Sequence, residues 1–476
     1  MLDQTKDLIQ KYRFDEANKN LESLGEEYDV DKKIFQSQIL RMKGKNKEAL
    51  ELADQALNQS QNKNYKIYEL EATVAKAYAL VRLGKHKETM KIIEHAEKIL
   101  ETMKKEERET VKELQATIFH VQGIAHSMEG KIERALTCTH KGLDIREELG
   151  LKGDIGYSLN NLGWSYYLSG ELDLSLEYHR KSLAIREDNQ NRIGIAHSLS
   201  NIGATYWEMG ELGNAFDSLT QALVISKESR DTYLSSSILL RLVELTLEMN
   251  QIDQANGYRR QLQEMDKNSN SLYVNSASHL VEALILKNSN RLRHKMDAQE
   301  ILEKIVAKFD DPELTVSAIK HPCRELRLTV GQVSNDPELI VRAIKHLCDL
   351  YLLELKTSGE ELVLQQAIDL AKTLYEIGRK TYFFSVSVEA LVLQAKFALL
   401  EGDIQRSQSL LSQAGLTAVE KGLKRLEKMV KEEQSVLEAD FERWLDLINE
   451  NASMRERIEQ AQLEDHIKQA IALRNV

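Results

Sequence analysis

The chain of 476 residues is about two to four times as long as a common single-core domain, so it must form several units or one elongated array. A hydrophobic content of 42% with 29% charged residues is typical of a folded, water-soluble chain and excludes a disordered one. With 3 prolines and 6% aromatic residues, the composition argues against β-barrels and β-sandwiches. Its many Leu, Glu, Lys, Ala and Gln residues favour an all-α fold.

The charge and cysteine content limit the partners and the compartment. A formal net charge of -11 gives no general attraction to phosphate polymers, so we expect no nucleic-acid partner. Three cysteines, Cys138, Cys323 and Cys348, are too few for a disulfide framework and indicate a reducing compartment. The first residues have no signal-peptide run, and no window approaches the roughly 20 apolar residues of a membrane helix. The sequence therefore predicts a cytoplasmic protein without a membrane partner.

The first predicted elements are helices that pair into hairpins. Residues 12–24 have the pattern of a second helix of a first repeat. Gly44 and Gly84 then mark the turns of the next two hairpins, with Ser37 and Ala77 at the equivalent position inside each first helix. We therefore expect the repeat array to begin close to residue 1.

The central part of the chain repeats with a period of about 40 residues, and the periodic positions fall in three columns. The columns are a glycine inside the first helix, a glycine seven residues later and a small residue five residues after that: Gly123, Gly163 and Gly203; Gly130, Gly170 and Gly210; Ala135, Ser175 and Ala215.

Each column has a physical reason. A glycine inside a helix costs about 1 kcal/mol against alanine, so it predicts a site where the partner helix crosses closely. The second glycine reads as a helix C-cap and turn, and the small residue lets the second helix approach the first. The pattern predicts helix–turn–helix hairpins that repeat along the chain.

Later segments continue the array in weaker form. The copies run through Arg241, Asn250 and Ala255, and an eighth, irregular copy follows around Ala298 and Leu302, after seven recognisable ones. We assign residues 1–270 to the array and residues 271–423 to degenerate hairpins, one of which spans 388–422 with Gly402 in its turn.

Two further segments have their own patterns. Residues 311–323, "DPELTVSAIKHPC", are nearly repeated at 336–348 as "DPELIVRAIKHLC", which indicates a local duplication of a helix. Residues 424–449 predict one long amphipathic helix within a C-terminal region at 424–476. We expect that helix to cap the array by packing on it rather than to form a coiled-coil dimer.

The string from Tyr157 to Arg186, "YSLNNLGWSYYLSGELDLSLEYHRKSLAIR", resembles the tetratricopeptide repeat in its 40-residue variety. It is similar to the repeats of kinesin light chains and of adaptors rich in Leu-Gly-Asn. The resemblance implies a right-handed superhelical solenoid whose first helices line a concave face. The last third resembles uncharacterised archaeal proteins with many such repeats, and this resemblance implies no function.

Patterns that carry catalysis are missing from the sequence. It has no phosphate-binding loop, no Gly-x-Ser-x-Gly elbow and no His-Glu-x-x-His pair. The pairs His321/Cys323 and His346/Cys348 are poor metal chelates, because residues two apart on a helix point to nearly opposite sides. We therefore expect a non-enzymatic protein with no cofactor and no metal site.

A set of polar and aromatic residues recurs on the face of the first helices beside the packed one, and it forms the candidate peptide-binding groove. Burying paired asparagines without partners would cost several kcal/mol, whereas an exposed amide both donates to and accepts from a peptide backbone. Tyrosine and tryptophan beside it are typical of binding hot spots. The candidate residues are His120, Tyr157, Asn160, Asn161, Trp164, Tyr167, His197, Ser200, Asn201, Trp207, Glu208, Arg241 and Glu244.

The resemblance implies that Asn161 and Asn201 clamp a partner peptide. The alternative is that these asparagines bridge neighbouring helices. The basic cluster of chaperone-binding repeats is missing, because Asn160 and His197 stand at its basic positions and only Arg241 fits.

Three functions follow in order of preference. The first is a non-catalytic scaffold that binds a peptide segment of a protein partner. The second is a peptide-sensing regulator that resembles bacterial quorum-sensing receptors. The third is a structural adaptor that assembles with itself through the array ends or the C-terminal helix.

Overall fold

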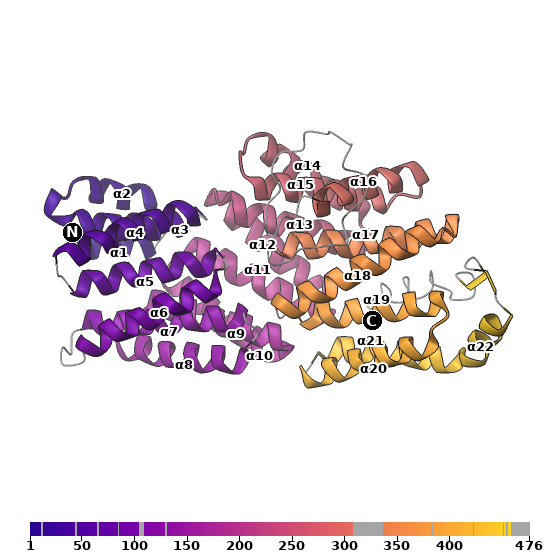
Figure 1. Ribbon diagram of the computed structural model, residues 1–476. Helices are drawn as coiled ribbons and strands as arrows, with labels where there is room; N and C mark the ends of the chain where they lie inside the picture. Colours follow the sequence, from indigo (N-terminus) through magenta and orange to yellow (C-terminus); the bar gives the residue numbers. More distant parts are fainter. Residues whose placement is uncertain are drawn as a thin grey trace. The chain divides into compact units, whose positions relative to one another are not determined.

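The computed structural model describes residues 1–457 apart from 11–12, 43–44, 64–65, 84, 104–108, 129–130, 308–336, 382–383, 422, 451 and 454–455. The secondary structure of the described residues is entirely helical, with short connections, and successive helices lie side by side as hairpins (Figure 1). This confirms the predicted all-α fold. The chain divides into two compact units, Met1–Leu168 with Leu172–Ile202 and Ser169–Glu171 with Gly203–Val476.

The helices of the first unit, and helix α11 in which the division falls, are α1 (Leu2–Gln10), α2 (Phe14–Glu22), the short 3-10 helix η1 (Glu26–Tyr28), α3 (Asp29–Met42), α4 (Asn46–Lys63), α5 (Lys66–Arg82), α6 (His86–Met103), α7 (Glu109–Met128), α8 (Ile132–Glu148), α9 (Lys152–Ser169), α10 (Leu172–Asp188) and α11 (Arg192–Glu208).

The second unit continues with α12 (Leu212–Glu228), α13 (Thr232–Glu248), α14 (Ile252–Lys267), α15 (Leu272–Lys287), α16 (Leu292–Ala307), α17 (Pro337–Ser358), α18 (Glu361–Thr381), α19 (Phe384–Glu401), α20 (Ile404–Glu420), α21 (Lys424–Ala439) and α22 (Phe441–Asn449). The odd-numbered helices from α1 to α19 are the first helices of their hairpins. The hairpins from α1/α2 to α15/α16 correspond to the seven predicted repeats and the irregular eighth.

Helix ends recur every 20 residues in the middle of the chain because one residue at each end takes the left-handed conformation. The residues with positive φ are Gly150, Gly170, Gln190, Gly210, Arg230 and Asn250. The predicted C-cap role of Gly170 and Gly210 is confirmed, since both have a φ of 81°. The other predicted turn glycines, Gly44, Gly84 and Gly130, lie outside the described residues.

The glycines inside the first helices mark the predicted close crossings. A Cβ atom on Gly163 would lie 2.7 Å from Cε1 of His179 in α10. A Cβ on Gly203 would lie 2.8 Å from Cγ of Leu219 in α12. Both distances are shorter than van der Waals contact, so a larger residue at either position requires the facing side chain to shift. The column of small residues, Ala135, Ser175 and Ala215, is fully buried in the same crossings.

The C-terminal segments pack as predicted but with one difference. Gly402 has a φ of 85° in the turn between α19 and α20, which confirms the predicted hairpin. The predicted single helix at 424–449 is wrong: α21 ends and α22 begins at Asp440. Aspartate is a weak helix former, and the break accompanies burial of Trp444 and Leu437 in one core with α19 and α20. The predicted boundaries at 270 and 423 fall between hairpins and stay predictions.

Candidate functional site

A row of polar contacts joins successive first helices of the first unit. The guanidinium carbon of Arg41 on α3 lies 3.7 Å from the centroid of the Tyr78 ring on α5. The Tyr78 hydroxyl lies 2.8 Å from Nε2 of His120 on α7. Nδ2 of Asn161 on α9 lies 3.3 Å from Nδ1 of the same imidazole. We call the side of α3, α5, α7 and α9 that carries these groups, continued on α11 by Asn201, the first-helix face.

The asparagines of this face bond to neighbouring helices and still have open hydrogen-bonding capacity. Nδ2 of Asn201 donates to Oδ1 of Asn160 at 3.0 Å, and Asn161 donates to His120. The predicted alternative of helix bridging is therefore part of their role. A primary amide has two donors and an acceptor oxygen. Among the described residues, Oδ1 of Asn161 and Nδ2 of Asn160 have no partner.

His120 lies between Tyr78 and Asn161 in this row, and its imidazole is neutral. Its side chain is 2% exposed, so it is less accessible than the sequence predicted. Burial and the positive charges of Arg146, Arg41 and Arg82 lower the pKa of His120 well below its ordinary value. Because Nη1 of Arg146 donates to Nδ1 of the ring at 3.3 Å, the ring hydrogen lies on Nε2 and points to the Tyr78 hydroxyl.

Two buried arginines join α8 to α9 and α10 to α11, and sequence reasoning missed them. Nη1 of Arg186, at the end of α10, donates to Oγ of Ser198 and to the carbonyl of Gly194, both at 2.8 Å. Arg146 makes the equivalent contacts one repeat earlier, with Oγ of Ser158 at 2.6 Å and the carbonyl of Asp154 at 3.4 Å. The available signal was the 40-residue spacing of an arginine followed by a serine twelve positions later.

The aromatic candidates of α9 are half-buried, and two of them contact each other. The rings of Trp164 and Tyr167 stack with centroids 5.2 Å apart and an interplanar angle of 14°. The guanidinium of Arg186 lies over the Tyr157 ring at 5.3 Å. Each of these rings thus contacts a neighbouring side chain and keeps part of its surface exposed.

The two other candidates of α11 in the first unit are less accessible than predicted. Burial, with a contribution from the charges of Arg186 and Arg82, lowers the pKa of His197 to about 3. His197 is half-buried and neutral at physiological pH, and the Ser200 side chain is 5% exposed.

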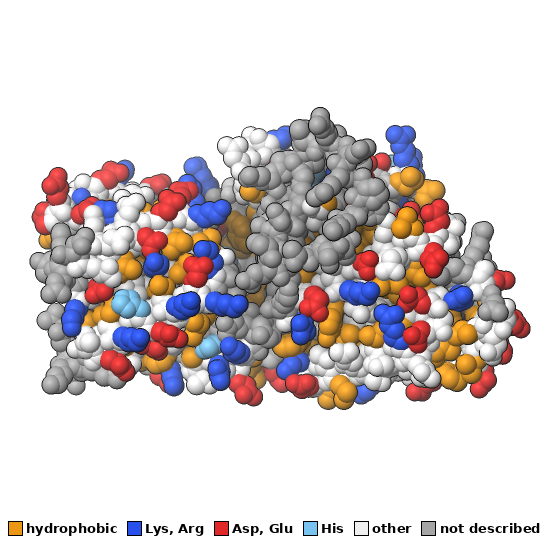
Figure 2. Space-filling view, viewed as in Figure 1, with side chains coloured by type: hydrophobic (Ala, Val, Ile, Leu, Met, Phe, Trp, Pro, Cys, Tyr) orange, Lys and Arg blue, Asp and Glu red, His pale blue; other side chains and the backbone are white. Residues whose placement is uncertain are grey.

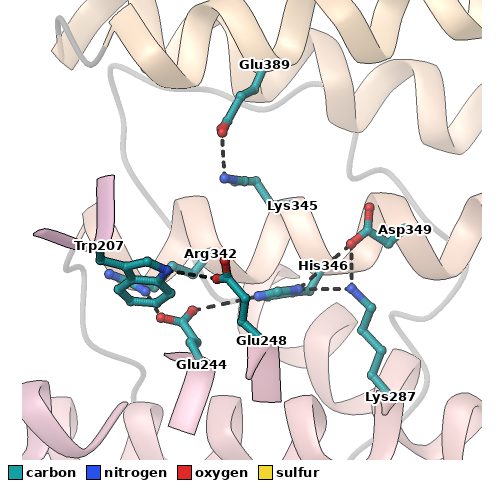
Figure 3. A network of polar contacts seen from close by, with 9 residues as sticks. All are labelled: Trp207, Glu244, Glu248, Lys287, Arg342, Lys345, His346, Asp349 and Glu389. Carbon is teal, nitrogen blue, oxygen red and sulfur yellow. Dashed lines mark hydrogen bonds and ion pairs between the residues drawn. The ribbon is translucent and has the colours of Figure 1, made fainter. Parts of the chain in front are cut away.

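The remaining candidates lie in the second unit, and one of them contacts α17, a helix that was not part of the predicted groove. Nε1 of Trp207 donates to Oε2 of Glu248 on α13 at 2.8 Å. Glu244, one turn earlier, forms an ion pair with Arg342 of α17 and lies 3.8 Å from Nε2 of His346 (Figure 3). Glu208 and Arg241, the other two candidates, are half-buried.

Further ion pairs connect α17 to α15 and α19. Nζ of Lys287 lies 2.5 Å from Oδ2 of Asp349 and 3.0 Å from Nδ1 of His346 (Figure 3). Lys345 pairs with Glu389 of α19 at 2.7 Å. The second copy of the duplicated string thus holds the first helices of this unit together. The first copy, with Cys323, lies outside the described residues.

The face of the molecule in Figure 2 carries side chains of both charges, and the described residues form no metal cluster. On the face shown in Figure 2, acidic and basic side chains are interspersed with hydrophobic ones over the described residues. In the same residues no three His, Cys, Asp or Glu side chains come together as a possible metal site. None of the helices, as far as they are described, has the length and apolar character needed to cross a membrane.

Comparison by sequence identifies one family. Residues 114–188, which include most of α7 and all of α8 to α10, match the family described as tetratricopeptide repeat. A search of the curated proteins found no match.

Comparison by structure finds similar folds at low identity. The apo form of the quorum sensor NprR from B. thuringiensis has a TM-score of 0.53 and 12% identity, over 78% of this chain and 97% of that one. A Rap protein complexed with competence and sporulation factor has a TM-score of 0.50 and 12% identity, over 85% and 98%. A STAND protein with a tetratricopeptide repeat sensor from Pyrococcus horikoshii has a TM-score of 0.45 and 13% identity. The match covers 59% of this chain and 42% of that protein's own length. At these identities the likeness shows the fold alone.

Proposed function

We propose that the chain is a non-catalytic interaction protein that binds a peptide segment of a protein partner on the first-helix face, within the array whose residues 114–188 match the tetratricopeptide repeat. The observation that carries the proposal is the pair of open amide groups on consecutive residues. Oδ1 of Asn161 accepts and Nδ2 of Asn160 donates, which is the complement of one peptide unit.

The surroundings of the two asparagines support this assignment. Trp164 and Tyr167 lie three and six residues beyond Asn161 on the same helix, and their stacked rings supply apolar area at low entropic cost. The contact of Asn161 with His120 holds the amide in place, so little side-chain freedom is lost when a ligand binds. The proposed cytoplasmic location and archaeal source rest on the sequence alone.

A second candidate is a receptor for a short signal peptide. It is favoured by the fold likeness to the quorum sensor NprR and to a Rap protein solved with competence and sporulation factor. The two candidates share one face and differ in whether the bound peptide is part of a larger protein.

Selection of random dodecapeptides on the immobilised full chain tests the proposal. We expect selected peptides to bind the wild type and to bind Trp164→Ala about tenfold more weakly, the loss expected for one aromatic hot-spot residue. Leu174→Ala is the matched control, because this side chain is also apolar, is 37% exposed and lies on the second helix of the same hairpin. Failure to select any peptide, or an equal loss in both variants, would refute the assignment.

A further inference from the structure

Cationic and apolar side chains lie together on the surface at the beginning of α16, in the second unit. The apolar pair, Leu292 and Met296, is one helical turn apart, and the two residues are 62% and 63% exposed. Arg291 and Arg293 beside them are exposed, and Lys295 is half-buried. We call these five residues the α16 patch.

The three cations of the α16 patch lack an acidic partner. Among the described residues, none of them forms an ion pair. The sequence has no Asp or Glu at residues 283–296. Further along the helix, Asp297 is half-buried and Glu300 pairs with Lys304. The α16 patch is therefore a place of local positive potential on a chain whose formal net charge is -11.

The apolar pair is exposed at a position that is covered in other hairpins. By the 40-residue repeat, the equivalents of Met296 on α8, α10 and α12 are Leu136, Leu176 and Phe216. All three are large and apolar, and each is buried or half-buried. Met296 is equally apolar but lies in water. Apolar surface beside cations without acidic partners favours a partner that is both apolar and anionic.

Stabilisation of the helix does not account for the cations. Second helices α8, α10 and α14 have an acid in the first turn, Glu133, Asp173 and Asp253, where it offsets the partial positive charge of the helix N-terminus. The first turn of α16 has no acid and instead contains Arg293 and Lys295. These charges are repelled by the helix N-terminus, so they add to its positive potential.

We propose that the α16 patch docks on the surface of a membrane that contains anionic lipids. Leu292 and Met296 enter the boundary between headgroups and acyl chains, and the cations beside them pair with lipid phosphates. Such peripheral binding needs no spanning helix. The acidic residues elsewhere in the chain oppose it little, because charges more than about 10 Å away are screened at ordinary ionic strength.

A bilayer fits the α16 patch better than the other anionic macromolecules do. Nucleic acid phosphates would pair with the cations but would leave Leu292 and Met296 in water. An acidic protein would need a surface shaped to receive two protruding side chains, whereas lipids pack around them. The α16 patch lies on a second helix, so this inference is independent of peptide binding on the first-helix face.

Co-sedimentation of the full chain with lipid vesicles tests the proposal. One set of vesicles is phosphatidylcholine alone, and the other has equal parts of phosphatidylcholine and phosphatidylglycerol. We expect the wild type to bind the anionic vesicles about a hundredfold more tightly, since each cation near an anionic surface contributes about fivefold. Arg291→Gln with Arg293→Gln should weaken this binding about twentyfold. Leu292→Ser with Met296→Ser should weaken it about tenfold.

Two double variants are matched controls. Arg134→Gln with Arg260→Gln removes two exposed arginines of other second helices and the same total charge. Leu416→Ser with Val419→Ser removes an apolar pair of α20 that is 73% and 58% exposed. Both should bind anionic vesicles like the wild type. Peptides selected on the wild type should bind all four double variants equally, so this proposal and the peptide proposal can fail separately.

The remaining outcomes contradict the proposal. Equal binding to both kinds of vesicle, no binding to either, or equal losses in the controls would refute the α16 patch as a membrane site. If the chain ignores vesicles but binds an oligonucleotide or polyglutamate, and only the arginine variant loses this, the partner is a nucleic acid or an acidic protein. The arginine variant removes side chains without ion pairs among the described residues, so it decides even if the apolar variant unfolds.

Discussion

At the scale of single residues, the environment of Gly163 shows how one missing side chain sets the contact between two helices. His179 of α10 fills the space that a Cβ on Gly163 would need. The His179 ring is fully buried, and its two nitrogens have no hydrogen-bond partner among the described residues. Burial, with the charge of Arg186, lowers the pKa of His179 to about 3. The imidazole is therefore neutral and packs against Gly163 by van der Waals contact.

We expect Gly163→Ala to destabilise the protein by about 1–3 kcal/mol, because the new methyl group overlaps the His179 ring and forces the helices apart. The control is Gly257→Ala, inside α14, where nothing lies within 4 Å of the new Cβ. That substitution should stabilise by up to about 1 kcal/mol through helix propensity. Urea unfolding measures both, and a gain of stability in Gly163→Ala would contradict the close crossing.

The carboxyl group of Glu71 on α5 gives a prediction about pH. Burial, together with the nearby acids Asp31 and Glu113 and against the opposing charge of Lys6, raises its pKa to about 7. The folded state then holds a proton that the unfolded state releases above about pH 4.5, so stability falls as the pH rises through 7. Glu71→Gln removes this penalty. The variant should be more stable than the wild type near pH 8, and the difference should vanish near pH 4. A constant difference across this range would show that the carboxyl titrates normally.

At the scale of elements, what holds one hairpin to the next differs along the chain. Between α8 and α11 the link is a buried arginine, whereas α17 is held by ion pairs to α13, α15 and α19. The C-terminal helices use hydrophobic contact instead, since Val430 and Trp444 are buried against α19 and α20. The hydrophobic contact of the C-terminal helices could be predicted from their amphipathic pattern. The buried arginines and the ion pairs of α17 could not.

Arg186→Met should therefore lower stability by about 2 kcal/mol, because the Ser198 hydroxyl and the Gly194 carbonyl lose a charged donor in a buried position. Arg134→Met removes an equally long but exposed side chain and should change stability by less than about 0.5 kcal/mol. Thermal or chemical unfolding separates the two. Equal effects would mean that Arg186 contributes only packing.

At the scale of the whole molecule, repeat arrays gain their stability from each hairpin and its neighbours, so local damage stays local. We expect Leu162→Ala, which empties a fully buried position of α9, to raise amide hydrogen exchange in α9 and α10 and in the hairpins beside them. Exchange in α19 and α20 should stay at the wild-type rate. A uniform increase along the chain would show a single cooperative unit instead.

The sequence by itself determined the helix hairpins, because the 40-residue period of glycines and small residues has only one sterically simple explanation. It also placed Gly163, Gly203, Gly170 and Gly210 correctly, since each of these depends on local backbone geometry or on one helix crossing.

Only the tertiary structure decided which polar groups are open to a ligand. His120 and Asn161 are both polar residues of the predicted groove. In the structure both ring nitrogens of His120 are bonded, to Tyr78 and Arg146, whereas the side-chain oxygen of Asn161 has no partner among the described residues. Likewise Glu244 forms an ion pair with Arg342, which is 98 residues away in the sequence. Hydrogen bonds and ion pairs are set by distances between helices far apart in sequence, and a periodic pattern carries no information about those distances.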